Sequence, residues 1–82
     1  MRVELDAKYF VDIIPLNHVL KRHIPPKPKP DGKLTAAREE VLGYFPNMEK
    51  CVRKAIKEAM LEGSEGVVVL FEDYLDRLNA AS

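Results

Sequence analysis

The chain has 82 residues, 46% hydrophobic and 32% charged, and its 13 basic and 13 acidic side chains give a formal net charge of zero. A chain of this length buries only about 60% of the surface that its unfolded form exposes, which excludes a two-domain enzyme with an interdomain cleft. Its longest apolar run, residues 67–71, is far shorter than the roughly 20 residues of a membrane span, and residues 1–4 do not resemble the start of a signal peptide. We therefore expect one small domain, residues 1–82, located in the cytoplasm and not in a membrane.

The zero net charge conceals an uneven distribution. Residues 1–38 carry a net charge of +4 and residues 39–82 a net charge of −4. Most of the excess positive charge comes from six cations that accompany a single acid, Asp31: Lys21, Arg22, Lys27, Lys29, Lys33 and Arg38. This stretch is either a solvated hairpin arm or a patch for nucleic acid or an acidic protein surface. It contains no aromatic residue, which disfavours a reader of single-stranded nucleic acid.

The first part of the chain predicts antiparallel strands. Residues 2–5 alternate polar and apolar side chains, and residues 9–14 are aromatic and β-branched. Pro15-Leu16-Asn17 favours a chain reversal into a third strand over residues 18–24. In that strand Leu20, Arg22 and Ile24 share one face, because side chains alternate along a strand.

A proline-rich segment follows the third strand. Four of the six residues 25–30 are prolines without an N–H group, which predicts an extended polyproline II arm without a paired strand interior. Asp31-Gly32 has the chemistry of a turn, so residues 25–33 are expected to form the exposed tip of a long hairpin. Such a segment also resembles a ligand for aromatic grooves. Residues 34–45 are predicted to return as a strand, with a helix over residues 35–40 as the alternative.

The last part of the chain, residues 47–80, predicts two helices. Asn47 is placed to cap the first helix, Gly63 to end it, and Ser64 to cap the second. The first apolar stripe recurs at helical spacing and consists of Met48, Cys51, Val52, Ala55, Ile56, Ala59 and Met60. The second consists of Val67, Leu70, Phe71, Tyr74, Leu75 and Leu78, although Val67-Val68-Val69 leaves a strand possible there. Together these elements predict an α+β fold, a three- or four-stranded antiparallel sheet covered on one face by an antiparallel helix pair.

Each helix also carries a charged ridge opposite its apolar stripe. At 100° per residue the first ridge spans about 100° and consists of Lys50, Arg53, Lys54 and Lys57. The second consists of Glu65, Glu72 and Asp76, with Asp73 at its edge. The ridges are either ordinary solvent faces or a partner surface with both signs of charge.

The candidates for catalysis and metal binding are sparse. The nucleophiles are Cys51, Ser64 and Ser82, with His18 and His23 as bases. Cys51 falls on the apolar stripe and is expected to be buried, and the two histidines are five residues apart, on opposite faces of a strand. A single cysteine excludes an internal disulfide. We therefore predict a protein that is not an enzyme and holds no metal or cofactor.

Three segments resemble a group of short uncharacterised proteins encoded by phages and prophages: residues 8–11 leading to 17–20, the Gly-Tyr-Phe-Pro-Asn-Met-Glu segment at 43–49, and the helix after Ser64. His18 stands where that pattern usually has an aromatic residue. The resemblance implies strands with a basic hairpin loop, a turn, two helices, and an accessory protein of a mobile element. By analogy with phage proteins of this size, it implies an inhibitor of host machinery, of anti-CRISPR or another anti-defence type.

The function predicted from the sequence is therefore a non-enzymatic phage or prophage protein that binds and inhibits a host protein complex through the arm and the charged helix faces. A nucleic-acid-binding accessory factor that uses the arm and the first helix is one alternative. A structural homodimer that buries an exposed apolar sheet face is another.

Overall fold

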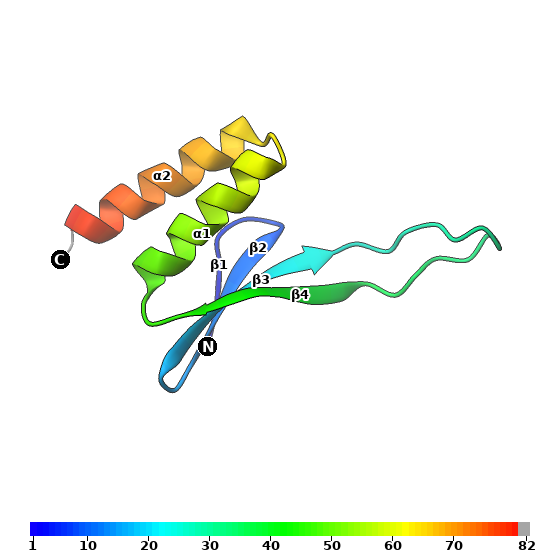
Figure 1. Cartoon of the computed structure of the whole chain (residues 1–82), viewed down its shortest axis with the longest axis horizontal. Coiled ribbons are helices and arrows are strands. Elements are labelled where there is room, and N and C mark those ends of the chain that lie inside the picture. The colour runs from blue at the N-terminus through cyan, green and yellow to red at the C-terminus, as the bar shows by residue number, and fades with distance from the viewer. Residues whose placement is uncertain (81–82) are drawn as a thin grey trace.

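The protein folds into a four-stranded antiparallel sheet with two helices on one face, which confirms the predicted α+β class (Figure 1). The structure is a computed structural model that describes residues 1–80. The strands lie side by side in chain order and are β1 (Arg2–Glu4), β2 (Tyr9–Ile14), β3 (Asn17–Ile24) and β4 (Arg38–Phe45). The helices are α1 (Met48–Leu61) and α2 (Glu65–Ala80). All residues of Val67-Val68-Val69 lie in α2, so the strand alternative for them is wrong.

The helix-covered face of the sheet holds the main core. Tyr9 and Val11 of β2 and Leu20 of β3 are buried there, against Val52 and Phe71 from the two helices. α1 lies over β3 and β4, whereas α2 packs mainly along α1 (Figure 1). α2 reaches the sheet through Phe71, whose ring meets Tyr9 edge to face with the ring centroids 5.7 Å apart. The second helix therefore has a broad outer surface.

The termini of α1 follow the predicted capping. The Asn47 side chain accepts a hydrogen bond of 3.0 Å from the Lys50 N–H, so it satisfies a donor that the first turn leaves unpaired. At the other end Gly63 has a φ of 75°, and the N–H of Ser64 donates to the Ala59 carbonyl. This is the Schellman arrangement, in which a left-handed glycine turns the chain out of the helix.

The return strand is shorter than predicted. It begins at Arg38, and Leu34 takes part only in an isolated bridge with Pro28. The helix considered for residues 35–40 is wrong, since residues 38–40 pair with β3. A register shift opposite Leu20 and Lys21 leaves Leu42 as an extra residue in β4. Gly43 next to it lies under the Phe45 ring, where an added Cβ would come within 2.8 Å of that ring.

The turn between β2 and β3 contains a strained residue. Ile14 pairs with Asn17, so Pro15 and Leu16 alone make the turn. Leu16 has a φ of 75°, a left-handed conformation that favours glycine or asparagine, and its side chain is almost fully exposed.

Candidate interaction surfaces

The proline-rich arm is a continuation of the β3–β4 ladder. The ladder pairs Ile24 with Arg38, and the same register extends to the bridge between Pro28 and Leu34. Near the tip the Lys29 N–H donates to the Lys33 carbonyl over 2.7 Å. Residues 25–33 form no strand, in line with the expectation from the prolines, although the isolated bridge and the hydrogen bonds near the tip join the two sides of the arm. The arm is a two-stranded ribbon that projects away from both helices (Figure 1).

The ribbon tolerates its prolines because they alternate with lysines. Successive N–H groups of a strand point to opposite sides, and only those that face the partner strand must be paired. The N–H groups of Lys27 and Lys29 face inward, and that of Lys27 donates to the Thr35 hydroxyl over 2.8 Å. Pro28 falls between them, on a position whose missing N–H would point to solvent, so it stiffens the arm without a lost hydrogen bond. Pro25 and Pro26 lie where the two sides of the arm form no strand.

The same alternation sorts the side chains of the arm into two faces. Lys27 and Lys29 share a face because they are two residues apart, and Lys33 joins them because it lies directly opposite Lys29. Pro28 and Leu34 lie on the other face. Asp31 and Gly32 close the tip: the Asp31 carboxylate accepts from the Lys33 N–H over 3.0 Å, and Gly32 has a φ of 85°. The arm therefore presents three lysines in a fixed array.

The three lysines of the arm outnumber its one acid, Asp31, whose carboxylate accepts from the backbone N–H of Lys33. Among residues 1–80 none of them forms an ion pair, and neither does Arg38 at the base of the arm. All are exposed. Like charges directly opposite each other in a ladder destabilise it, so the pair formed by Lys29 and Lys33 works against folding of the arm. An anionic partner would remove that repulsion.

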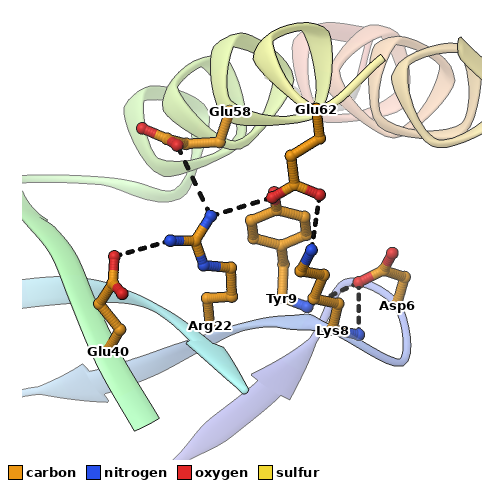
Figure 2. Close-up of polar contacts among 7 residues, drawn as sticks. All are labelled: Asp6, Lys8, Tyr9, Arg22, Glu40, Glu58 and Glu62. Carbon is orange, nitrogen blue, oxygen red and sulfur yellow. Dashed lines mark hydrogen bonds and ion pairs between the residues drawn. The ribbon is translucent and has the colours of Figure 1, made fainter. Parts of the chain in front are cut away.

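A second set of charges, at the base of the same ribbon, is fully compensated (Figure 2). Arg22 turns toward the helices, where its guanidinium lies 2.7 Å from Glu40, 2.9 Å from Glu62 and 3.8 Å from Glu58. Glu62 also accepts from Lys8 Nζ and from the Tyr9 hydroxyl, both at 2.6 Å. The structure thus places Arg22, which the sequence assigned to the partner surface, in an internal network that joins β2, β3 and β4 to the end of α1.

This network shifts the ionisation of its members. Burial, helped by the hydrogen bond to Glu62, raises the pKa of Tyr9 to about 12. The hydrogen bonds from Lys8 and Tyr9 hold the pKa of the Glu62 carboxyl below its ordinary value. Both shifts favour the protonation states that the hydrogen bonds require, a phenol that donates and a carboxylate that accepts. The network is therefore a structural clamp.

Lys21 is also engaged, on the face of the sheet away from the helices. Its ammonium lies 2.8 Å from Asp12, which keeps the pKa of that carboxyl below its ordinary value. Arg2 pairs with Asp12 and with Glu39 and covers the Phe10 ring at 4.1 Å. Phe10 is fully buried beneath this polar cover although no helix lies on it. The same face also carries Val41 and Tyr44, which pair with Lys21 and Val19 and are 47% and 64% exposed, so the homodimer alternative stays a prediction.

The basic ridge of α1 lines a hollow of about 320 Å³. The hollow is lined by the four residues of the predicted ridge, Lys50, Arg53, Lys54 and Lys57. Phe45, which the sequence analysis did not single out, completes the lining. Arg53 pairs with Glu49 and Lys54 with Glu58. The hollow lies on the helix side of the sheet, and Lys27 of the arm lines a separate hollow with Arg22 and Glu40.

Concavities also occur at the base of the arm and on α2. A hollow of about 400 Å³ combines apolar walls from Ile24, Pro25 and Ala37 with the cations Lys8 and Arg38. On α2 a smaller one of about 270 Å³ is lined by Val69 and the acidic ridge: Glu72, Asp73 and Asp76.

The candidate nucleophile is inert in this environment. Cys51 is buried as predicted, burial raises the pKa of its thiol to about 11, and its Sγ faces the His18 carbonyl at 3.6 Å. His23 stacks on Phe10 on the other face of the sheet. Within residues 1–80 no three His, Cys, Asp or Glu side chains converge on a point where a metal would bind, and Ser82 lies outside the described residues. No helix in that range has the length and apolarity to cross a membrane.

Comparison with protein-family models, with curated proteins and with solved structures finds no match to this chain. The resemblance to phage proteins therefore stays a prediction, and the functional argument depends on the surfaces described above.

Proposed function

We propose that the protein is a non-enzymatic binding protein that attaches to an acidic surface of a host protein complex through its arm and thereby inhibits that complex in the host cytoplasm. The observation that supports binding is the array of Lys27, Lys29 and Lys33, which projects from the domain without an ion pair among residues 1–80. The phage context and the inhibitory outcome depend on the sequence resemblance alone.

The base of the arm favours a protein as the partner. The hollow lined by Ile24, Pro25 and Ala37 gives an apolar side chain of the partner a place beside the cations. Binding energy at protein interfaces concentrates in such desolvated pockets, with charges at the rim that steer the approach. The turn-locked ribbon also loses little conformational entropy on binding.

Duplex nucleic acid is the second candidate, because a two-stranded ribbon fits into the major groove and lysines neutralise phosphates. The arm and the α1 ridge line separate hollows, which speaks against the version of this candidate that uses both clusters. A nucleic acid complex weakens steeply with salt, whereas a protein complex with a filled apolar pocket is much less sensitive.

The test is a pull-down from a nuclease-treated bacterial lysate with three proteins, read by mass spectrometry at two salt concentrations. The wild type is compared with K29E/K33E and with the control K50E/K57E, which carries the same change of net charge on the α1 hollow. We expect the wild type and the control to retain the same stoichiometric protein and K29E/K33E to lose it, with equal melting temperatures. Retention by K29E/K33E, or recovery of nucleic acid alone, would overturn the proposal.

A further inference from the structure

The outer face of α2 combines apolar and acidic side chains that are exposed in the part of the chain that the structure describes. Val69 is exposed at its centre, and two hollows meet there. The larger, about 480 Å³, lies at the turn between the helices and is mostly apolar, lined by Met60, Gly63, Ser64, Glu65, Val68 and Val69. The other is bounded by the acidic ridge. A contiguous apolar strip rimmed by charge is typical of an interaction surface.

The carboxylates around this strip are available. Among residues 1–80 neither Glu65, Glu72 nor Asp76 forms an ion pair, while Asp73 is engaged by Arg77 at 2.7 Å. Glu72 and Asp76 are one helical turn apart, so their side chains start about 6 Å from each other. That spacing is close to the roughly 7 Å that separates alternate residues of a strand.

The charge pattern of the arm is the complement of this face. Lys27 and Lys29 are alternate residues of one strand, and Lys33 lies beside Lys29. The aliphatic part of a lysine side chain can cover an apolar surface while its ammonium group contacts a charged partner. The aliphatic parts of the arm lysines therefore fit over Val69 and Met60, and their ammonium groups reach the carboxylates around the strip. The arm projects away from the α2 of its own chain (Figure 1). The complement must therefore come from another molecule.

We propose that the outer face of α2 binds the arm of a second copy of this chain, in a reciprocal pair in which each arm lies on the other copy's α2. The arm lysines and the carboxylates of Glu72 and Asp76 form no ion pairs within residues 1–80, so these two surfaces of opposite charge make two copies mutually complementary. The pairing goes beyond the proposed function, because it needs no other partner and occupies the same arm. The paired form hides the lysines, and dilution or a competing partner releases them.

The test is sedimentation velocity of the full chain over a range of concentrations at low and high salt. We expect the mass to rise from 9.3 kDa toward twice that value with concentration, and salt to reverse the rise. K29E/K33E and E72K/D76K are each expected to weaken the association at least about tenfold. Each variant replaces two neighbouring charges of one sign by two of the other sign, so the repulsion between the two neighbours is unchanged. The melting temperature of each variant should therefore match that of the wild type.

Charge exchange supplies the decisive comparison. K29E/K33E/E72K/D76K restores opposite charges between arm and α2 at zero net charge, and we expect it to self-associate again. The control K50E/K57E/E72K/D76K also has zero net charge but a basic arm facing a basic α2, and it should stay monomeric. A monomeric wild type at the highest concentration, or equal behaviour of the two quadruple variants, would overturn the pairing. E72K/D76K leaves the arm intact and should still retain the protein partner, so the two proposals fail independently.

Discussion

Arg22 at the base of the β3–β4 ribbon forms ion pairs, whereas the cations at its tip form none among residues 1–80. At the base, Arg22 faces three carboxylates and is mostly shielded from solvent. At the tip, Lys29 and Lys33 lie directly opposite each other, and neither forms an ion pair within residues 1–80. The base lies in the β3–β4 ladder, which ends at Ile24 and Arg38, whereas the tip is joined by an isolated bridge and a few hydrogen bonds.

The comparison separates charges that hold the fold from charges that are free to bind. A guanidinium that leaves water must be paired, so the base recruits Glu58 and Glu62 from α1. The tip stays in water and needs no such compensation, and its stability comes instead from turn geometry and prolines. Variants at the base should therefore change folding, and variants at the tip should change binding.

The largest effect is expected for R22M, which keeps much of the side-chain volume but leaves Glu40, Glu58 and Glu62 without their shared cation. We expect the free energy of unfolding to fall by about 2 kcal/mol, less than for a fully buried pair because the site is partly hydrated. Urea denaturation measures it. R38M, at the base of the arm but outside any ion pair, is the matched control and should change stability by less than about 0.5 kcal/mol. An equal loss of unfolding free energy in R22M and R38M would contradict the view that the ion-paired cation at the base stabilises the fold more than an unpaired one does.

A smaller effect, with a pH signature, is expected for Y9F. Loss of the hydroxyl that donates to Glu62 should cost about 1 kcal/mol at neutral pH. Because folding raises the pKa of Tyr9 from 10.0 to about 12, the stability from this group is complete below pH 10.0 and is lost as the pH rises toward about 12. The gap between wild type and Y9F, measured by urea denaturation, should therefore narrow over that interval. A gap that stays constant would show that the phenol does not ionise as the network requires.

The smallest effect is expected at the tip. K33E places a carboxylate opposite Lys29 and replaces repulsion by attraction, which should stabilise the arm by about 0.5 kcal/mol. The readout is slower hydrogen exchange of the Lys29 amide, which donates to the carbonyl of residue 33. K27E, opposite Thr35, should slow it less. Faster exchange in K33E would mean that the two side chains do not face each other.

Much of the local structure follows from short-range signals. The cap at Asn47 and the left-handed Gly63 were predictable because each depends on a few neighbouring atoms. The common side of Lys50 and Lys57 followed from helical geometry in the same way. The extended arm without a strand over residues 25–33 followed from the prolines, whereas the alternation of proline and lysine over residues 27–30 allowed the hydrogen bonds near the tip, because only every second N–H has to be paired.

The candidate surfaces needed the tertiary structure. Nothing near Arg22 in the sequence indicates that Glu58 and Glu62, more than 30 residues away, neutralise it, and the network appears only when α1 crosses the end of the sheet. The placement of Phe45 in the basic hollow is likewise a consequence of helix packing.

The sequence by itself determined the first strands, the ends of the first helix and the concentration of positive charge around the hairpin, because propensity, capping and alternation act over a few residues. It left the start of the return strand open, which the pairing of Arg38 with Ile24 decided. The tertiary structure decided which of those cations remain free. Ion pairing depends on distances between distant segments, and these are set only when the helices pack on the sheet and the arm extends beyond it.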